Sequence, residues 1–194
     1  GIDNIAGTNY DWGVYNKISN GGNEAGLWRT LTGDEWEYIF HGRKDAEYLF
    51  ALGTVNDVNG LIILPDNWKT PADLTFNAST LKGFIWAEDK EYSIKYYYNP
   101  SEASNYNDNI YTNAEWEKME TAGAVFLPIA GCKFGEGIGS YYNGELGSYW
   151  SSSLGNVNKE FDCGAALIYF GAGVLYVNMT IGIGNISVRL VKDV

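Results

Sequence analysis

The chain has 194 residues, of which 45% are hydrophobic and 15% aromatic. This hydrophobic content excludes an intrinsically disordered chain, and the length is sufficient for one domain with a sizeable core. The formal net charge is −11, and such an acidic chain is repelled by nucleic-acid phosphates and by anionic membranes. No apolar run is long enough to span a bilayer. We therefore expect neither a nucleic-acid partner nor membrane insertion by this segment.

The composition favours strands over helices. Glycine accounts for 24 residues and tyrosine for 15. Glycine, asparagine and serine mark turns, whereas aromatic and β-branched residues are enriched in strands. We therefore expect many strands joined by turns, with helices confined to short windows.

The clearest predicted helix covers residues 31–43. Thr32 is a favourable N-cap, and Glu35 three residues later completes a capping box. Trp36 begins an apolar face with i, i+3, i+4 spacing, and Gly42 is expected to end the helix.

A second helix is predicted at residues 112–122, with the same start. Thr112 and Glu115 repeat the capping box, Trp116 begins the apolar face, and Gly123 is expected to end the helix. Both starts follow the pattern Thr-x-x-Glu-Trp-Glu, which we interpret as two uses of good capping chemistry rather than as an internal repeat.

Strands are predicted on both sides of the second helix. Two apolar runs at residues 51–55 and 61–64 enclose a polar segment and indicate a β-hairpin with a longer turn. Residues 66–111 are the least regular part and are expected to form an inserted loop region. Later strands are predicted from β-branched and aromatic content at residues 124–129, 131–134, 149–153, 165–170, 174–178 and 186–191.

Few residues offer metal-binding or redox chemistry. His41 is the only histidine, and its place in the last turn of the first predicted helix indicates a cap or surface residue rather than a catalytic base. Cys132 and Cys163 are the only cysteines, and with one histidine they are too few for a zinc site. Whether they form a disulfide or remain two separate buried thiols stays open.

Hydroxyls and carboxylates do not form a recognisable catalytic set. The serines at 151–153 would need an adjacent base to act as nucleophiles. The spacing selects no pair for glycoside hydrolysis among Glu136, Glu145, Glu160 and Asp162. The oxygen-rich segment 105–109 could hold calcium but lacks the ligand spacing of an EF-hand. We therefore predict no cofactor, with calcium as the open alternative.

Four motifs follow one another along the chain. They are Trp-Arg-Thr-Leu-Thr-Gly-Asp-Glu-Trp-Glu-Tyr at 28–38, Phe-Leu-Pro at 126–128, Tyr-Trp-Ser-Ser-Ser at 149–153 and Ser-Val-Arg-Leu-Val-Lys at 187–192. Together they resemble the Fibrobacter succinogenes major paralogous domain of Bacteroidetes surface proteins. That family is similar to the C-type lectin fold. Its relatives include the formylglycine-generating, sulfatase-modifying domains and the variable proteins of diversity-generating retroelements.

The resemblance implies an α+β, C-type-lectin-like fold in which two short helices flank antiparallel β-sheets. The chain would form a single domain over residues 1–194, with residues 66–111 inserted and the N- and C-terminal strands close together. It also implies a secreted or cell-surface protein, anchored to the outer membrane through segments outside this sequence. We expect a monomer.

Two features of the relatives are missing. The enzyme relatives need a close pair of cysteines, whereas Cys132 and Cys163 are far apart in the sequence. Calcium-dependent lectins carry Glu-Pro-Asn and Trp-Asn-Asp, and neither occurs. We therefore predict a non-enzymatic binding or adhesion module for a surface protein or glycan. The alternatives are a carbohydrate-binding module that uses tyrosines and a sulfatase-modifying type of enzyme.

The interval between the third and fourth motifs is apolar on both faces of its predicted strands. Alternation along the strands places residues 166, 168, 170 and 174 on one face. The other face would hold Leu167, Tyr169, Leu175, Val177 and Met179. This second face is either buried by the rest of the chain or binds a partner. The candidate ligand-binding residues are Tyr141, Tyr142, Asn156, Leu167, Tyr169, Leu175, Tyr176, Val177, Asn178, Met179 and Ile181.

Overall fold

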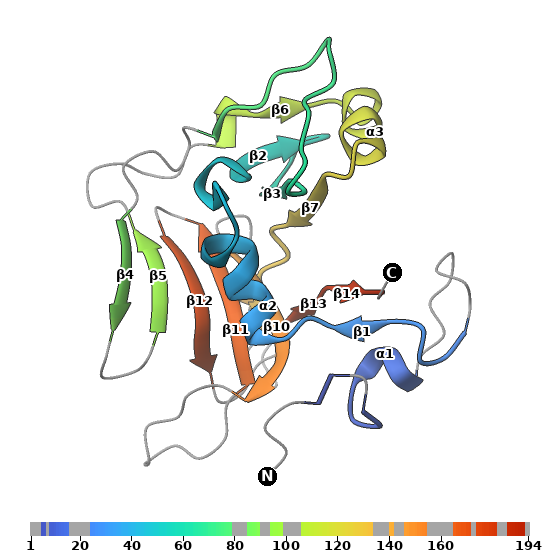
Figure 1. Ribbon diagram of the computed structural model, residues 1–194, viewed down its shortest axis with the longest axis vertical. Coiled ribbons are helices and arrows are strands. Elements are labelled where there is room, and N and C mark those ends of the chain that lie inside the picture. The colour runs from blue at the N-terminus through green and yellow to red at the C-terminus, as the bar shows by residue number, and fades with distance from the viewer. Residues whose placement is uncertain are drawn as a thin grey trace.

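The computed structural model describes residues 5–6, 8–15, 24–78, 85–89, 94–98, 106–133, 140–141, 146–154, 165–171, 174–181 and 186–192. These residues form an α+β structure, as predicted (Figure 1). The helical elements are α1 (Trp12–Tyr15), α2 (Gly33–Glu37), the π-helical turn η1 (Tyr38–Gly42), the 3-10 turns η2 (Ala46–Tyr48) and η4 (Tyr106–Asp108), and α3 (Asn113–Thr121).

The strands of the described segments form two larger sheets and two strand pairs. The six-stranded sheet has the order β13 (Ser187–Val188), β10 (Leu146–Leu154), β11 (Ala165–Gly171), β12 (Val174–Ile181), β5 (Ile94–Tyr98), β4 (Ile85–Asp89). The four-stranded sheet has the order β6 (Ile110–Tyr111), β2 (Phe50–Val55), β3 (Val58–Ile63), β7 (Val125–Pro128). The pairs are β1 (Arg29–Thr30) with β14 (Leu190–Val191) and β8 (Cys132–Lys133) with β9 (Ser140–Tyr141).

The two larger sheets are mixed, not purely antiparallel as the resemblance implies. Strand β13 runs parallel to β10, and β6 runs parallel to β2. The expected closeness of the N- and C-terminal strands is confirmed, because Arg29 of β1 lies opposite Val191 of β14.

Both predicted helix starts are confirmed in atomic detail. The Thr32 hydroxyl accepts a hydrogen bond from the Glu35 backbone N–H at 3.1 Å, and the Thr32 N–H donates to the Glu35 carboxylate at 2.8 Å. Thr112 and Glu115 repeat both bonds at the start of α3. Each box satisfies two backbone N–H groups that would otherwise lack partners.

The first hairpin has a shorter turn than predicted. Strand β3 begins at Val58 rather than at residue 61, so only Asn56 and Asp57 remain between the strands. Their φ angles are 47° and 65°. A two-residue hairpin turn of this kind requires positive φ at both positions, which Asn and Asp tolerate better than most residues.

The prediction of an irregular insertion at 66–111 is wrong for its later part. Strands β4 and β5 lie within it, and β5 pairs antiparallel with β12, with Tyr97 opposite Leu175. The run Lys-Tyr-Tyr-Tyr at 95–98 has strong strand propensity. The segment therefore extends the six-stranded sheet at its edge.

The main hydrophobic core joins the first helix to both larger sheets. Figure 1 shows α2 lying across the face of β10, β11 and β12. The Trp36 ring stacks on Phe40 with centroids 5.9 Å apart, and Phe40 meets Phe50 edge-on at 5.1 Å. The other members of this core are Leu31, Leu52, Leu61, Ile63, Leu127, Tyr149, Ile168, Phe170, Leu175 and Val177. A second cluster under α3 contains Ile62, Tyr111 and Met119, among others.

A buried arginine, Arg43, fixes the end of the helical segment α2–η1 to the four-stranded sheet. Arg43 donates to the carbonyl oxygens of Ile39, Leu64 and Leu49 at 2.7, 2.6 and 3.2 Å, and it pairs with Asp66 at 3.1 Å. Burial lowers the pKa of the guanidinium from its usual value, and Asp66 acts in the opposite direction. The helical segment ends at Gly42, as predicted, and the guanidinium of Arg43 satisfies the carbonyl of Ile39 in its last turn.

We expect Gly147→Ala to destabilise the fold through a clash with Phe170. An added Cβ would lie 2.2 Å from the Phe170 ring, which faces it across β10 and β11. Such overpacking costs about 1–3 kcal/mol. Chemical denaturation of G147A, F170A and the double variant tests this origin, because F170A alone removes the ring and should cost about 3–5 kcal/mol. The double variant should be clearly less destabilised than the sum of the two, and additive effects would contradict the clash.

Candidate binding sites

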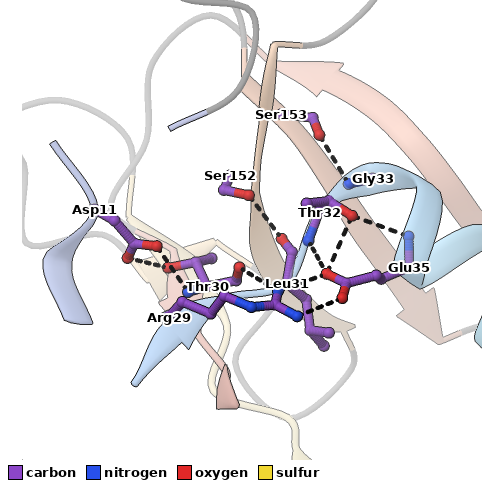
Figure 2. A network of polar contacts seen from close by, with 9 residues as sticks. All are labelled: Asp11, Arg29, Thr30, Leu31, Thr32, Gly33, Glu35, Ser152 and Ser153. Carbon is purple, nitrogen blue, oxygen red and sulfur yellow. Dashed lines mark hydrogen bonds and ion pairs between the residues drawn. The ribbon is translucent and has the colours of Figure 1, made fainter. Parts of the chain in front are cut away.

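The third motif is hydrogen-bonded to the first (Figure 2). The Ser152 backbone N–H donates to the Leu31 carbonyl at 2.8 Å, and the Ser152 hydroxyl lies 3.4 Å from the same oxygen. The Gly33 N–H, at the start of α2, donates to the Ser153 hydroxyl at 3.0 Å. The serines of β10 therefore hold the chain at the point where it enters the helix.

A buried carboxylate supports this junction from the N-terminal side. Asp11 is fully buried, and its oxygens accept from the Thr30 N–H at 3.0 Å, the Thr30 hydroxyl at 2.8 Å and the Gly13 N–H at 3.1 Å. Figure 2 shows Asp11 facing Thr30. The prediction missed Asp11, because nothing in the sequence connects it with a strand so far along the chain.

Arg29 and Glu35 form a two-pronged ion pair within the same motif. The Arg29 Nη1 and Nη2 atoms lie 2.8 and 2.6 Å from the two carboxylate oxygens (Figure 2). The hydrogen bonds from Arg29, aided by those from Thr32, hold the pKa of Glu35 at about 2, although partial burial acts to raise it. The Glu35 carboxylate thus accepts hydrogen bonds from the Thr32 backbone, which caps the helix, and from the Arg29 guanidinium.

The remaining two motifs meet the same junction. The Tyr149 hydroxyl donates to the Pro128 carbonyl at 2.8 Å, which ties the third motif to the second. Burial raises the pKa of Tyr149 to about 12, with Arg189 acting in the opposite direction. The fourth motif pairs through β13 with Tyr149 and Trp150 and through β14 with β1. The third motif therefore contacts the other three, and we call this junction of the four motifs the framework.

The framework holds the strands that carry the predicted ligand-binding residues, but the predicted faces are partly wrong. The register joins Gly171 to Val174 and Phe170 to Leu175. Directly opposed residues point to the same face, so Leu175 and Val177 belong to the core with Phe170. Both side chains are buried, at 1% and 0% exposure. The prediction assumed a three-residue turn at 171–173, and a one-residue shift exchanges the two faces.

Tyr169 and Tyr176 lie on the other face of these strands, which we call the outer face. They are directly opposed in the register and partly exposed. Their ring centroids are 5.9 Å apart with planes tilted by 57°. The outer face therefore presents a tyrosine pair, and it is separate from the core face that α2 covers.

The other predicted site residues are only partly described. Tyr141 lies in β9, opposite Cys132. Leu167 lies opposite Met179, and both flank a register shift in the β11–β12 pair; Asn178 and Ile181 are also in β12. The side chains of these five residues lie outside the described part of the chain, as do Tyr142, Asn156 and Cys163 entirely.

Asn109, the last residue of the predicted oxygen-rich segment, has a structural role. Asn109 is buried, and its carboxamide oxygen accepts from the Asn77 N–H at 2.8 Å. Its amide nitrogen donates to the carbonyl oxygens of Leu52 and Asn77 at 3.0 and 2.9 Å. Asn109 therefore fastens residue 77 to strand β2. His41 is exposed in η1, in accord with the predicted surface position.

An apolar cavity that the prediction missed lies beside the framework. Its volume is about 360 Å³, within the range of small-molecule sites. Its walls come from the first, second and fourth motifs, from η1 and from strands β3 and β7. The lining residues are Trp28, Leu31, Trp36, Ile39, Ile63, Val125, Leu127, Arg189, Leu190, Val191 and Lys192.

One polar group in the cavity wall is unsatisfied. The Trp36 indole N–H is buried and has no hydrogen-bond acceptor among the described residues. A buried donor left unpaired costs about 1–3 kcal/mol. The charged residues in the lining are Arg189 and Lys192, both exposed, so the cavity has a cationic rim in a chain of net charge −11.

No family model, curated protein or solved structure matches the chain. The likeness to a surface-protein domain therefore rests on the four motifs themselves. Within the described residues, no helix has the length and apolar character needed to cross a membrane.

We expect Glu35 to make the stability of the fold depend on acid pH. The pKa of Glu35 drops from an ordinary 4.5 to about 2 on folding. Its contribution to the free energy of unfolding is therefore complete above pH 4.5 and is lost as the pH falls toward 2. Between about pH 5 and pH 2, the urea midpoint of Glu35→Gln should therefore fall less than that of the unsubstituted chain.

Glu115→Gln is the matched control for this experiment. Glu115 completes the other capping box, where hydrogen bonds from Thr112 lower its pKa, but this box lies at the surface and contains no arginine. Its substitution should alter the pH profile much less, because solvent screens an exposed carboxylate. Equal changes in the two variants would contradict a special role for the Arg29 pair.

Proposed function

We propose that this chain is a non-enzymatic ligand-binding or adhesion module of a surface protein, with a C-type-lectin-like framework. The observation that carries the proposal is the junction of the four motifs, in which the third motif contacts the other three. A resemblance based on short motifs is better supported when those motifs contact one another in the structure. The framework supports the likeness to the Fibrobacter succinogenes major paralogous domain, and with it export to the cell surface.

The outer face is the proposed contact surface. Tyr169 and Tyr176 combine a large apolar ring with a polar hydroxyl, a combination that is enriched in binding interfaces. Tyr169 and Tyr176 lie on strands β11 and β12. The opposite face of these strands packs against the hydrophobic core, and β11 also pairs with β10 of the framework. A rigid base keeps the rings in place before binding and so lowers the entropic cost of association.

The positions of the hydroxyls support a binding role rather than hydrolysis. Ser152 and Ser153 use their side-chain oxygens on the backbone of residues 31 and 33. The Ser151 hydroxyl accepts from the Ser153 N–H at 3.2 Å, and Ser151 is buried. These bonds give the triple-serine motif a structural task.

Carbohydrate binding by tyrosine stacking is the second candidate. It is favoured by the aromatic character of the outer face, since sugar rings pack on aromatic surfaces. The tilt of 57° between Tyr169 and Tyr176 means that the two rings do not form one flat platform, which favours a protein ligand. Calcium is not needed for either mode.

We expect the double substitution Tyr169→Ala and Tyr176→Ala to abolish ligand binding without unfolding the chain. Both side chains stand outside the core, so the loss of stability should be small. The measurement is binding of the labelled chain to a glycan array and to an array of extracellular-matrix and bacterial surface proteins, with and without calcium.

Tyr48→Ala is the control, because Tyr48 is 63% exposed and lies in η2, away from the outer face. It should bind as the unsubstituted chain does. Signal on the protein array alone supports the protein ligand, and signal on the glycan array alone supports the second candidate. Unchanged binding by the double variant, or no signal on either array, would count against the proposal.

A further inference from the structure

The cavity beside the framework is a second candidate site, independent of the outer face. Trp36 lines it and belongs to the core that covers the opposite side of β10–β12. The cavity is open to solvent, and an apolar guest would be stabilised there because it removes the apolar walls from water. The volume of about 360 Å³ lies at the lower end of the range of small-molecule sites. It therefore suits a small guest.

The charges at the cavity select the kind of guest. Arg189 and Lys192 are both exposed, and among the described residues neither has an ion-pair partner. Among the residues that the structure describes, no acidic residue contributes to the lining, although the chain as a whole has a charge of −11. A guest with an anionic end is thus favoured at the rim and disfavoured over most of the surface.

The Trp36 ring forms part of the apolar wall. Its indole N–H is covered by the protein itself, so the ring offers a guest apolar surface rather than a hydrogen bond. The remaining walls are apolar side chains of the first, second and fourth motifs and of η1, β3 and β7. A site with apolar walls and a few polar groups is typical of small-molecule pockets.

We propose that this cavity binds a small apolar carboxylic acid. The hydrocarbon or aromatic body fills the space between Trp36, Leu127 and Val191, and the carboxylate lies toward Arg189 and Lys192. This inference does not depend on the ligand of the outer face, and either site can fail its test without the other.

The test uses 4-phenylbutyrate as the probe, with its amide and its amine analogue 4-phenylbutylamine as charge controls. The expected order of affinity is carboxylate, then amide, then amine, with a dissociation constant of about 1 mM or tighter for the carboxylate. NMR titration of the ¹⁵N-labelled chain should shift the Trp36 indole N–H resonance. Arg189→Ala should weaken carboxylate binding about two- to five-fold, because the charge is exposed.

Two further variants make the result specific. Arg189→Glu should weaken the carboxylate and strengthen the amine, and because Arg189 is exposed the fold is retained. Val125→Phe should fill the cavity and abolish binding of the carboxylate, with thermal unfolding to confirm the fold. Lys44→Ala is the control for removal of a cation elsewhere, since Lys44 is 91% exposed.

Three outcomes would overturn the proposal. One is the absence of any shift of the Trp36 resonance at 10 times the expected ~1 mM dissociation constant. Another is equal affinity for the three probes, which would remove the role of the cationic rim. The last is a stable dimer in which a second copy fills the cavity, detected by ultracentrifugation as a dimer that the probe does not dissociate.

Discussion

The backbone hydrogen bond from Ser152 to the Leu31 carbonyl links strand β10 to the start of helix α2. On its two edges, β10 pairs with β11 and β13. Near its C-terminal end, Ser152 and Ser153 hold residues 31 and 33. The position of α2 over the sheet therefore depends on a short polar contact. The same contact sets where Trp36 and Phe40 enter the core.

The polar contacts and the core support each other. A buried hydroxyl or carbonyl without a partner would cost free energy, so Ser151 and Ser152 are tolerated at 5% and 3% exposure because their hydroxyls are hydrogen-bonded. Close packing also occurs within the sheet, where Gly147 of β10 lies directly against the Phe170 ring of β11. Close packing of this kind leaves one arrangement of the strands, and Arg43 then fixes the other end of the helix to the smaller sheet.

The sequence predicts what is local and misses what depends on distant contacts. Both capping boxes are read correctly because three adjacent residues decide them. The faces of β12 are misread because a turn one residue shorter moves Leu175 into the core, and the sequence around residues 171–173 allows both turns. Asp11 and the cavity could not be predicted, since each is formed by segments far apart in the chain. The four motifs identify residues that resemble a family pattern, but they do not predict that these residues contact one another in the fold.

The separation of the two faces of β11 and β12 has a consequence for recognition. Substitutions at Leu175 or Val177 change the core, because both are buried against α2 and the smaller sheet. Tyr169 and Tyr176 occupy the alternate positions, where a change of side chain leaves that core intact. A ligand on the outer face would thus contact side chains that can be substituted without changing the core, on strands whose core-facing side chains cannot. The framework and the core supply this division, because α2 and its contacts cover the face opposite Tyr169 and Tyr176.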